Sequence, residues 1–226
     1  PGQSSIFFLR RLTNPRPARP SVFRCDPMPT ARTESRHPLV EMYDALFRAY
    51  GPQGWWPGHT RTEIVVGAIL TQNTNWRNVE KAIAKLKAED LLDWTALRNV
   101  EQTQLAEYIR PAGYFNIKAR RLKNFVAWLW EQHDGDFDGL EGMNPTLLRE
   151  ELLGVSGVGP ETADSILLYA LDIPTFVVDA YTARVVGRHG LLDGSAGYDE
   201  IKALFEDLLP ADARMFNEYH ALLVAV

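Results

Sequence analysis

The stretch Leu152-Leu153-Gly154-Val155-Ser156-Gly157-Val158-Gly159-Pro160-Glu161-Thr162-Ala163-Asp164 decides the fold class of this chain. Its apolar spacing predicts a helix that ends at Leu153 and a tight turn over residues 155–159. A second helix is expected to begin at Pro160, because proline favours the first position of a helix. The stretch therefore predicts two helices joined by a hairpin.

The hairpin has the features of a phosphate-binding turn. Gly157 and Gly159 permit positive φ and let an anion approach the backbone closely. The N–H groups of Val158, of Gly159 and of the first turn of the following helix would then point outward, where the helix dipole favours negative charge. The turn alone also fits a plain helix–helix connection, a cradle for another phosphate, or half of a dinucleotide fingerprint, although no strand precedes it.

Helical spacing continues through most of the chain, and only Thr175–Val178 has the β-branched density of a strand. Four residues without a partner do not make a sheet. The first helix is expected to end at Gly51-Pro52, and Thr60 or Thr62 is expected to begin the second. The sequence predicts an all-α fold of about ten helices, near residues 39–50, 62–70, 79–86, 105–109, 119–129, 146–153, 161–171, 180–189, 201–209 and 216–226.

Charge is distributed unevenly along the 226 residues, whose formal net charge is −5. Residues 1–37 contain seven arginines and two acidic residues and are rich in proline, so we expect a disordered basic arm there. Met28 is a possible natural start, which leaves the status of residues 1–27 open. The acidic remainder argues against DNA binding by bulk positive charge, but a hairpin that uses backbone N–H groups needs no lysine.

Other composition features exclude whole classes of protein. No apolar run reaches the roughly 18 residues that cross a bilayer. Cys25 is the only cysteine, so these residues predict neither a disulfide framework nor a cysteine-ligated metal. His133, His189 and His220 are scattered and predict no metal site.

The hairpin and its surroundings resemble the helix-hairpin-helix of the endonuclease III superfamily of DNA glycosylases. The shared features are Thr162-Ala163 after the hairpin, the apolar run ending at Asp179, the stretch over residues 113–119 and the helix end over residues 131–135. The resemblance covers roughly residues 38–226. It implies two helical domains with the active-site cleft between them: residues 60–174 form a six-helix barrel with the helix-hairpin-helix at 146–171, and residues 38–59 and 175–226 form the other domain.

The resemblance also assigns catalytic roles. Asp179 matches the catalytic aspartate, whose carboxylate would stabilise positive charge on the sugar; alternatively it only caps the helix that follows. Glu161 stands where members that cleave the strand have a lysine, and a carboxylate cannot form their Schiff base. Since Lys118 and Lys123 lie on a different predicted helix, water is the expected nucleophile.

Three tryptophans in polar or loop surroundings suggest a base pocket. Trp55, Trp56 and Pro57 follow the first helix, and Trp76 follows the polar stretch over residues 71–75. This arrangement resembles the 3-methyladenine DNA glycosylase III branch, and electron-rich indoles would bind a cationic alkylated purine. The alternative is ordinary core packing. Gln72 stands at the family's wedge position, where it would fill the gap left by a base flipped out of the helix.

Residues expected to contact the DNA backbone are Val155, Gly157, Val158, Gly159, Thr162, Lys118 and Arg184. The sequence thus predicts a monofunctional N-glycosylase for alkylated purines such as 3-methyladenine, acting as a cytoplasmic monomer on damaged double-stranded DNA. The alternatives are a glycosylase for oxidised pyrimidines or mismatches, and a non-catalytic DNA-binding protein. No cofactor is expected from these residues; a [4Fe-4S] cluster would need a cysteine loop beyond Val226.

Overall fold

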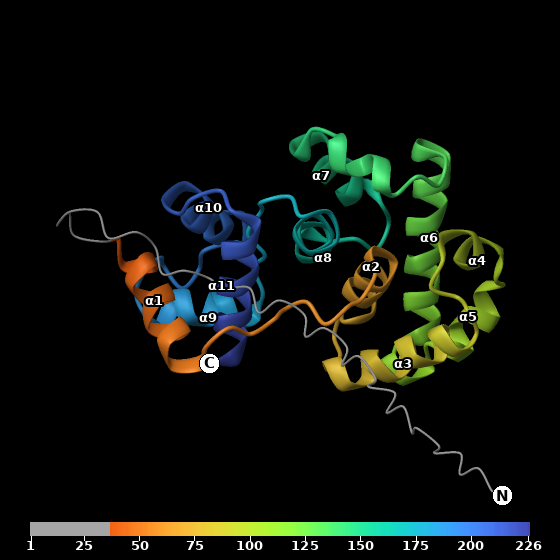
Figure 1. Ribbon diagram of the computed structural model, residues 1–226, viewed down its shortest axis with the longest axis horizontal. Coiled ribbons are helices and arrows are strands. Elements are labelled where there is room, and N and C mark those ends of the chain that lie inside the picture. The colour runs from red at the N-terminus through yellow and green to blue at the C-terminus, as the bar shows by residue number, and fades with distance from the viewer. Residues whose placement is uncertain (1–36) are drawn as a thin grey trace, which may run out of the picture. The chain divides into compact units, whose positions relative to one another are not determined.

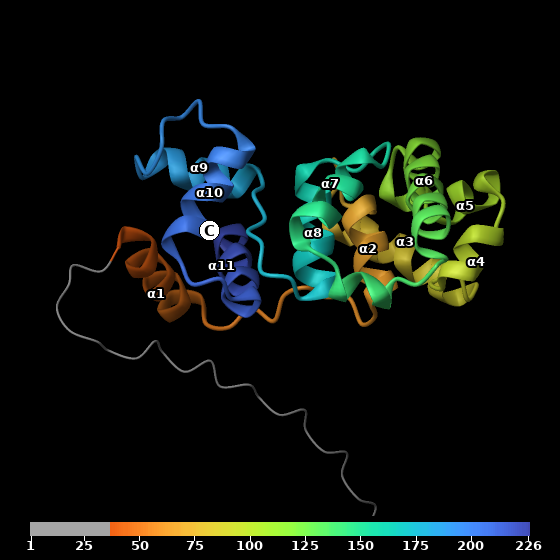
Figure 2. The same cartoon turned by 90° about the horizontal axis from the view of Figure 1, so that it is seen from above.

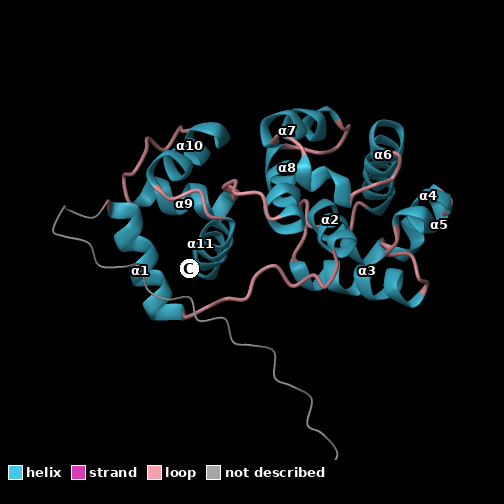
Figure 3. Ribbon diagram, turned by 45° about the horizontal axis from the view of Figure 1, so that its top comes forward, coloured by secondary structure: helices cyan, strands magenta, loops and turns pink. Residues whose placement is uncertain are grey.

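The computed structural model describes residues 37–226, which contain helices and loops and no strand (Figures 1 and 3). The prediction of an all-α fold is therefore confirmed. The basic arm, apart from His37, lies outside the described residues and stays a prediction. The helices are α1 (Pro38–Tyr50), α2 (Arg61–Leu70), α3 (Trp76–Ala88), α4 (Trp94–Asn99), α5 (Gln102–Tyr108), α6 (Phe115–His133), α7 (Pro145–Gly154), α8 (Pro160–Ser165), α9 (Ala180–Arg188), α10 (Tyr198–Leu208) and α11 (Ala213–Ala225).

Short polar signals set several helix ends. The Thr60 side chain accepts a hydrogen bond from the backbone N–H of Glu63, so Thr60 rather than Thr62 caps α2. Gly51, at φ +70°, ends α1 as expected, and its N–H donates to the carbonyl of Phe47. These ends follow local chemistry that the sequence displays directly.

The apolar spacing of the sequence does not predict two features of the helices. Helix α4 is only six residues long and buries Leu97 alone, which leaves no repeated apolar spacing to detect. Residues Ile166–Ala170 form a π-helical turn that continues α8, and all five are buried. A segment that is apolar on every side carries no helical period, so the wider turn could not be anticipated. Two short 3-10 turns, Arg110–Ala112 and Asp138–Gly142, complete the described elements.

The described residues form two hydrophobic clusters. One is built by α2 to α8 and the segments between them, and it includes Ile69, Phe125 and Leu152. The other is built mainly by α1, α10, α11 and the segment that leads into α9. Figures 1 and 2 show these two groups of helices as separate bundles, so the fold has two helical parts as expected. The proposed boundaries stay a prediction, since Leu168 and Tyr169 already pack in the second cluster.

Helix α1, from the start of the described chain, packs against α11 from its end (Figure 2). The Tyr219 hydroxyl donates to the carbonyl of Leu39 at 2.8 Å, and the rings of Phe176 and Phe205 stack at 3.9 Å in the same core. Because α1 belongs to this bundle, the chain must cross between the bundles twice, over residues 51–60 and 171–179. These two crossings carry Trp55, Trp56 and Asp179.

Candidate active site

A cavity of about 910 Å³ lies where the two crossings, the hairpin and α11 meet. It brings together residues that are far apart in the chain. The residues that line it include Trp55, Trp56, Gln72, Trp76, Gly157, Gly159, Glu161, Thr162, Asp179 and His220. A volume of this size is ample for one nucleobase.

The three tryptophans form one aromatic wall. The ring centroids of Trp55 and Trp56 are 5.3 Å apart, and those of Trp56 and Trp76 are 5.1 Å apart with the rings nearly perpendicular. A Cβ at Gly67 would lie 3.3 Å from the Trp76 ring and 3.4 Å from that of Trp56, so the absent side chain lets these rings approach α2. Pro57 is exposed and does not line the cavity, so its expected place in the base pocket is wrong.

Asp179 caps α9 and faces the cavity at the same time. Its Oδ1 accepts hydrogen bonds from the backbone N–H and the hydroxyl of Thr182 at 2.8 and 2.9 Å. Its Oδ2 lies 3.6 Å from Nε2 of His220. Desolvation works to raise the pKa of this carboxyl, but His220 and Thr182 outweigh it and hold the pKa below its ordinary value. The two roles weighed for Asp179 are therefore compatible, and the carboxylate stays ionised.

Glu161 lies in the first turn of α8 and lines the same cavity. Partial desolvation of its carboxyl, followed by the negative charge of Asp179, raises its pKa above the ordinary value. Among the described residues that line the cavity, none is a lysine. The position therefore offers a carboxylate and no amine that could attack the sugar.

The hairpin forms as expected, but its details differ. Gly157 has φ +102°, whereas Gly159 is extended at φ −99°, so only the first glycine needs its conformational freedom. The N–H of Val158 donates to the carbonyl of Val155 inside the turn and is not available to an anion, which corrects the expectation for Val158. The side chains of Val155 and Val158 are buried and anchor the turn in the first hydrophobic cluster.

Gln72 connects the end of α2 to the hairpin. Its Nε2 donates to the carbonyl of Gly157 at 3.1 Å and to the hydroxyl of Thr162 at 2.9 Å, while its Oε1 accepts from Arg121. The stem of Arg121 also covers Gly157, where a Cβ would collide with it. A wedge role for Gln72, which stays a prediction, would require these bonds to break when DNA binds.

Lys118 does not lie where a phosphate could reach it. Its side chain is 1% exposed, and Nζ donates to the carbonyls of Leu70 and Ala112, each at 2.8 Å. Desolvation, with a smaller effect from Arg121, lowers the pKa of Lys118 to about 8. The expected contact between Lys118 and the DNA backbone is therefore wrong. The ammonium group instead donates hydrogen bonds to the carbonyls that end α2 and the 3-10 turn at Arg110–Ala112.

Replacing Lys118 by methionine is expected to lower the free energy of unfolding by about 1–3 kcal/mol, because two buried carbonyls lose their donor. Urea unfolding measures this change. The matched control is Arg120→Met, which removes an exposed charge from the same helix and should stay within about 0.5 kcal/mol of wild type. A loss of DNA affinity by folded Lys118→Met that exceeds that of Arg120→Met would contradict this assignment.

Some residues around the cavity were not anticipated. His220, Tyr169, Arg121 and Tyr181 lie in or beside it, and no local motif marks any of them. Arg184 is exposed and packs over the ring of Tyr181, with its Cζ 5.2 Å from the ring centroid. Its contact with the DNA backbone stays a prediction.

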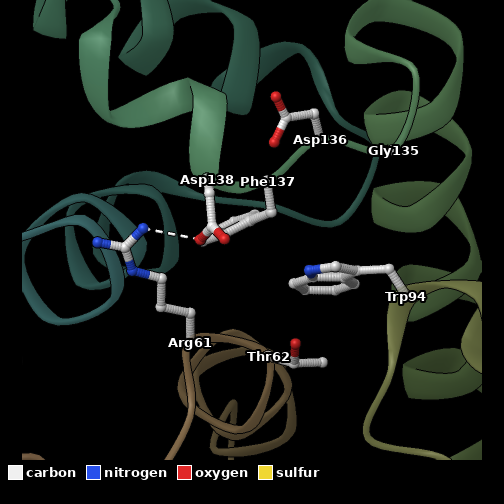
Figure 4. Close-up of a pocket in the computed structure, with 7 residues that line it drawn as sticks. All are labelled: Arg61, Thr62, Trp94, Gly135, Asp136, Phe137 and Asp138. Carbon is white, nitrogen blue, oxygen red and sulfur yellow. Dashed lines mark hydrogen bonds and ion pairs between the residues drawn. The ribbon is translucent and has the colours of Figure 1, made fainter.

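A second hollow of about 350 Å³ lies beside the start of α2 (Figure 4). Figure 4 shows the Arg61 guanidinium directed at the carboxylate of Asp138, at 2.7 Å, with Trp94 on the far side. Arg61 also pairs with Glu141 at 2.8 Å. Its charge is thus engaged in exposed ion pairs, which contribute about 0–1 kcal/mol each. The other carboxylate of the hollow, Asp136, accepts a hydrogen bond from the backbone N–H of Gly139.

Within residues 37–226, no group of three or more histidine, cysteine or acidic side chains has a geometry that could hold a metal ion. A [4Fe-4S] cluster needs four thiolates, and the sequence contains a single cysteine, Cys25. No described helix is long and apolar enough to span a membrane.

Comparisons with known proteins identify the family of this chain. Residues 66–211 match the HhH-GPD superfamily of base excision DNA repair proteins. A Methanocaldococcus jannaschii protein named as a DNA repair glycosylase is 53% identical over 187 residues, which cover 82% of this chain and 85% of that protein. Endonuclease III of Sulfolobus acidocaldarius is 28% identical over 161 residues, covering 70% and 69% of the two chains.

Solved structures share the fold. The crystal structure of Helicobacter pylori 3-methyladenine DNA glycosylase bound to 1,N6-ethenoadenine has a TM-score of 0.70 and 28% identity, over 81% of this chain and 94% of that one. An endonuclease III–DNA complex, 20% identical, has a TM-score of 0.69 over 81% of each chain. This chain belongs to the HhH-GPD superfamily of base excision DNA repair glycosylases, the endonuclease III superfamily, and is a DNA N-glycosylase.

Proposed function

We propose that this protein is a monofunctional glycosylase that excises alkylated purines, such as 3-methyladenine, from double-stranded DNA with water as the nucleophile. One observation carries the proposal: a single cavity places Asp179 and Glu161 under a wall of three tryptophans and contains no lysine among its described lining residues. A flipped base would stack on the indoles while its sugar lies near Asp179.

The charges in the cavity suit a cationic base. Alkylation at N3 or N7 makes a purine positively charged, which strengthens both stacking and cation–π attraction to indole. The charged base leaves without much help from an acid, so the protein needs chiefly to stabilise the positive sugar that remains. The Asp179 carboxylate, ionised and fixed by Thr182, supplies that stabilisation and can orient water.

A neighbouring structure supports the substrate class. The Helicobacter pylori protein whose structure resembles this chain is a 3-methyladenine glycosylase bound to a modified adenine. We carry over the class of substrate, a modified purine, and assign its recognition here to Trp55, Trp56 and Trp76.

Purified protein is expected to release free base from a duplex with one alkylated purine and to leave the strand intact until alkali is added. The reason is that Glu161 cannot form the imine through which a lysine cleaves the strand. Release of base and nicking of the strand are scored separately on the same end-labelled duplex. Borohydride trapping of a protein–DNA adduct would contradict the proposal.

The control for substrate class is a matched duplex that carries thymine glycol in the same position. Preference for this neutral lesion would favour a glycosylase for oxidised pyrimidines and reduce the tryptophans to packing residues. Retained DNA binding with no release of any base would favour a non-catalytic DNA-binding protein.

The hairpin makes a separate prediction about affinity. Gly159→Val should weaken binding to every duplex alike, because a side chain there meets open space in the free protein and would occupy the path of a phosphate. Gly157→Val should do so as well, and it should also destabilise the fold, because Gly157 has positive φ and is covered by Arg121. Fluorescence anisotropy and urea unfolding measure the two effects.

The control for this pair is Gly142→Val, at an open position outside the cavity. It should leave affinity unchanged. A change in lesion preference without a change in general affinity would show that the hairpin is not the phosphate site.

A further inference from the structure

His220 is a buried histidine whose two ring nitrogens have different surroundings. It lies on α11, is 5% exposed and lines the cavity. Its Nδ1 is 2.6 Å from the hydroxyl of Tyr169, itself buried. Its Nε2 has no hydrogen-bond partner among the described residues and faces Oδ2 of Asp179 at 3.6 Å. A buried, unpartnered nitrogen directed at a carboxylate requires an explanation.

The surroundings determine which nitrogen carries a proton. Burial raises the pKa of Tyr169 well above its ordinary value, so its phenol keeps its proton and can donate to Nδ1. The proton of a neutral His220 then sits on Nε2 and points at Asp179. The opposite tautomer would direct a lone pair at a carboxylate, and a charged imidazolium would still carry the Nε2 proton. Both favourable states therefore present the same N–H to Asp179.

We propose, building on the proposed glycosylase function, that His220 is a positioning residue whose Nε2–H holds Oδ2 of Asp179, with Tyr169 fixing the ring. Thr182 already holds Oδ1 of Asp179, so a hydrogen bond from Nε2–H to Oδ2 would fix the carboxylate at both oxygens. The distance of 3.6 Å exceeds a hydrogen bond, and contacts of this kind shorten when substrate fills the site. The Tyr169 ring also packs on Trp56, with centroids 4.9 Å apart, which couples the aromatic wall to the same chain of contacts.

The charges around His220 give it a second effect. The titratable groups that face it are Asp179, Glu161 on α8 and Tyr169 on the π-helical turn. The two carboxylates repel one another, and the repulsion favours protonation of one of them. A proton donor placed against Asp179 opposes this for Asp179, whose pKa is held below its ordinary value, whereas the pKa of Glu161 is raised above its own.

Three variants of the full chain test the role in turnover. His220→Leu should lower the single-turnover rate of base release about a hundredfold, the loss expected for a misplaced catalytic group, with duplex affinity unchanged. His220→Gln should keep most of the rate, because its amide can accept from Tyr169 and donate to Asp179. His189→Gln, an exposed position, is the control. Equal losses in the leucine and glutamine variants, or no loss in the leucine variant, would overturn the proposal.

The pH profile separates positioning from simple packing. Without His220, less opposes the effect of desolvation, so the pKa of Asp179 should rise. The acid limb of the rate profile of His220→Leu should therefore move to higher pH by about one unit. The carboxyl titration of Asp179, followed by ¹³C NMR, should move in the same direction. A rate lowered equally at every pH, with an unmoved Asp179 titration, would show that His220 only fills space.

A spectroscopic test is independent of activity. Long-range ¹H–¹⁵N NMR of the wild type should show the proton of neutral His220 on Nε2, and Tyr169→Phe should yield a mixture of tautomers. A wild-type proton on Nδ1 would overturn the inference whatever the enzyme excises. If the NMR results hold while methylated DNA is left intact, the proposed substrate fails and the positioning of Asp179 by His220 stands.

Discussion

Asp179→Asn is expected to reduce the single-turnover rate of base release at least about a hundredfold, the loss typical of removing a main electrostatic stabiliser. Asparagine caps helices as well as aspartate does, so α9 should keep its N-terminal hydrogen bonds to Thr182. The change therefore removes the negative charge and leaves the fold. Affinity for the duplex should be equal or higher, since one negative charge near the phosphates is lost.

The control for Asp179 is Asp193→Asn, which removes one charge from an exposed position where the aspartate also accepts a backbone hydrogen bond. It should leave the rate unchanged. Rapid-quench assays on a duplex with a single alkylated purine measure both variants. A wild-type rate for Asp179→Asn would make the residue a helix cap and no more.

Trp76→Leu is expected to reduce the single-turnover rate on a cationic alkylated purine roughly 30-fold, which corresponds to a desolvated cation–π contact of about 2 kcal/mol. The Trp76 ring lines the cavity, and its centroid lies 5.1 Å from that of the Trp56 ring. Leucine keeps an apolar side chain at the start of α3 but has no electron-rich face. A neutral lesion loses only stacking with this ring, so its rate should fall less.

The control for Trp76 is Trp94→Leu, because Trp94 packs against Phe125 and Phe137 away from the large cavity. This variant should lose stability without changing the ratio of rates on cationic and neutral lesions. Parallel assays on methylated purine and thymine glycol duplexes give that ratio. If Trp76→Leu lowered the rate equally on both lesions, the aromatic wall would not recognise the charge of the base.

The sequence by itself determined the helical class, the hairpin and several helix ends. Gly51, Thr60 and Pro160 act on backbone groups within a few residues, so the helix ends that they set can be predicted without a tertiary structure. The resemblance carried by the hairpin then pointed to Asp179 and Glu161, which both line the large cavity, because their distances along the chain from Gly157 are a property of the sequence.

Only the tertiary structure decided which side chains meet. Lys118 and Arg120 look alike in a basic stretch, yet the packing of α6 against α2 buries the first and exposes the second. His220 lies far along the chain from Asp179 and Tyr169, and no spacing rule links them. Contacts of this kind depend on how whole helices pack, and burial, partner and charge environment exist only once they have packed.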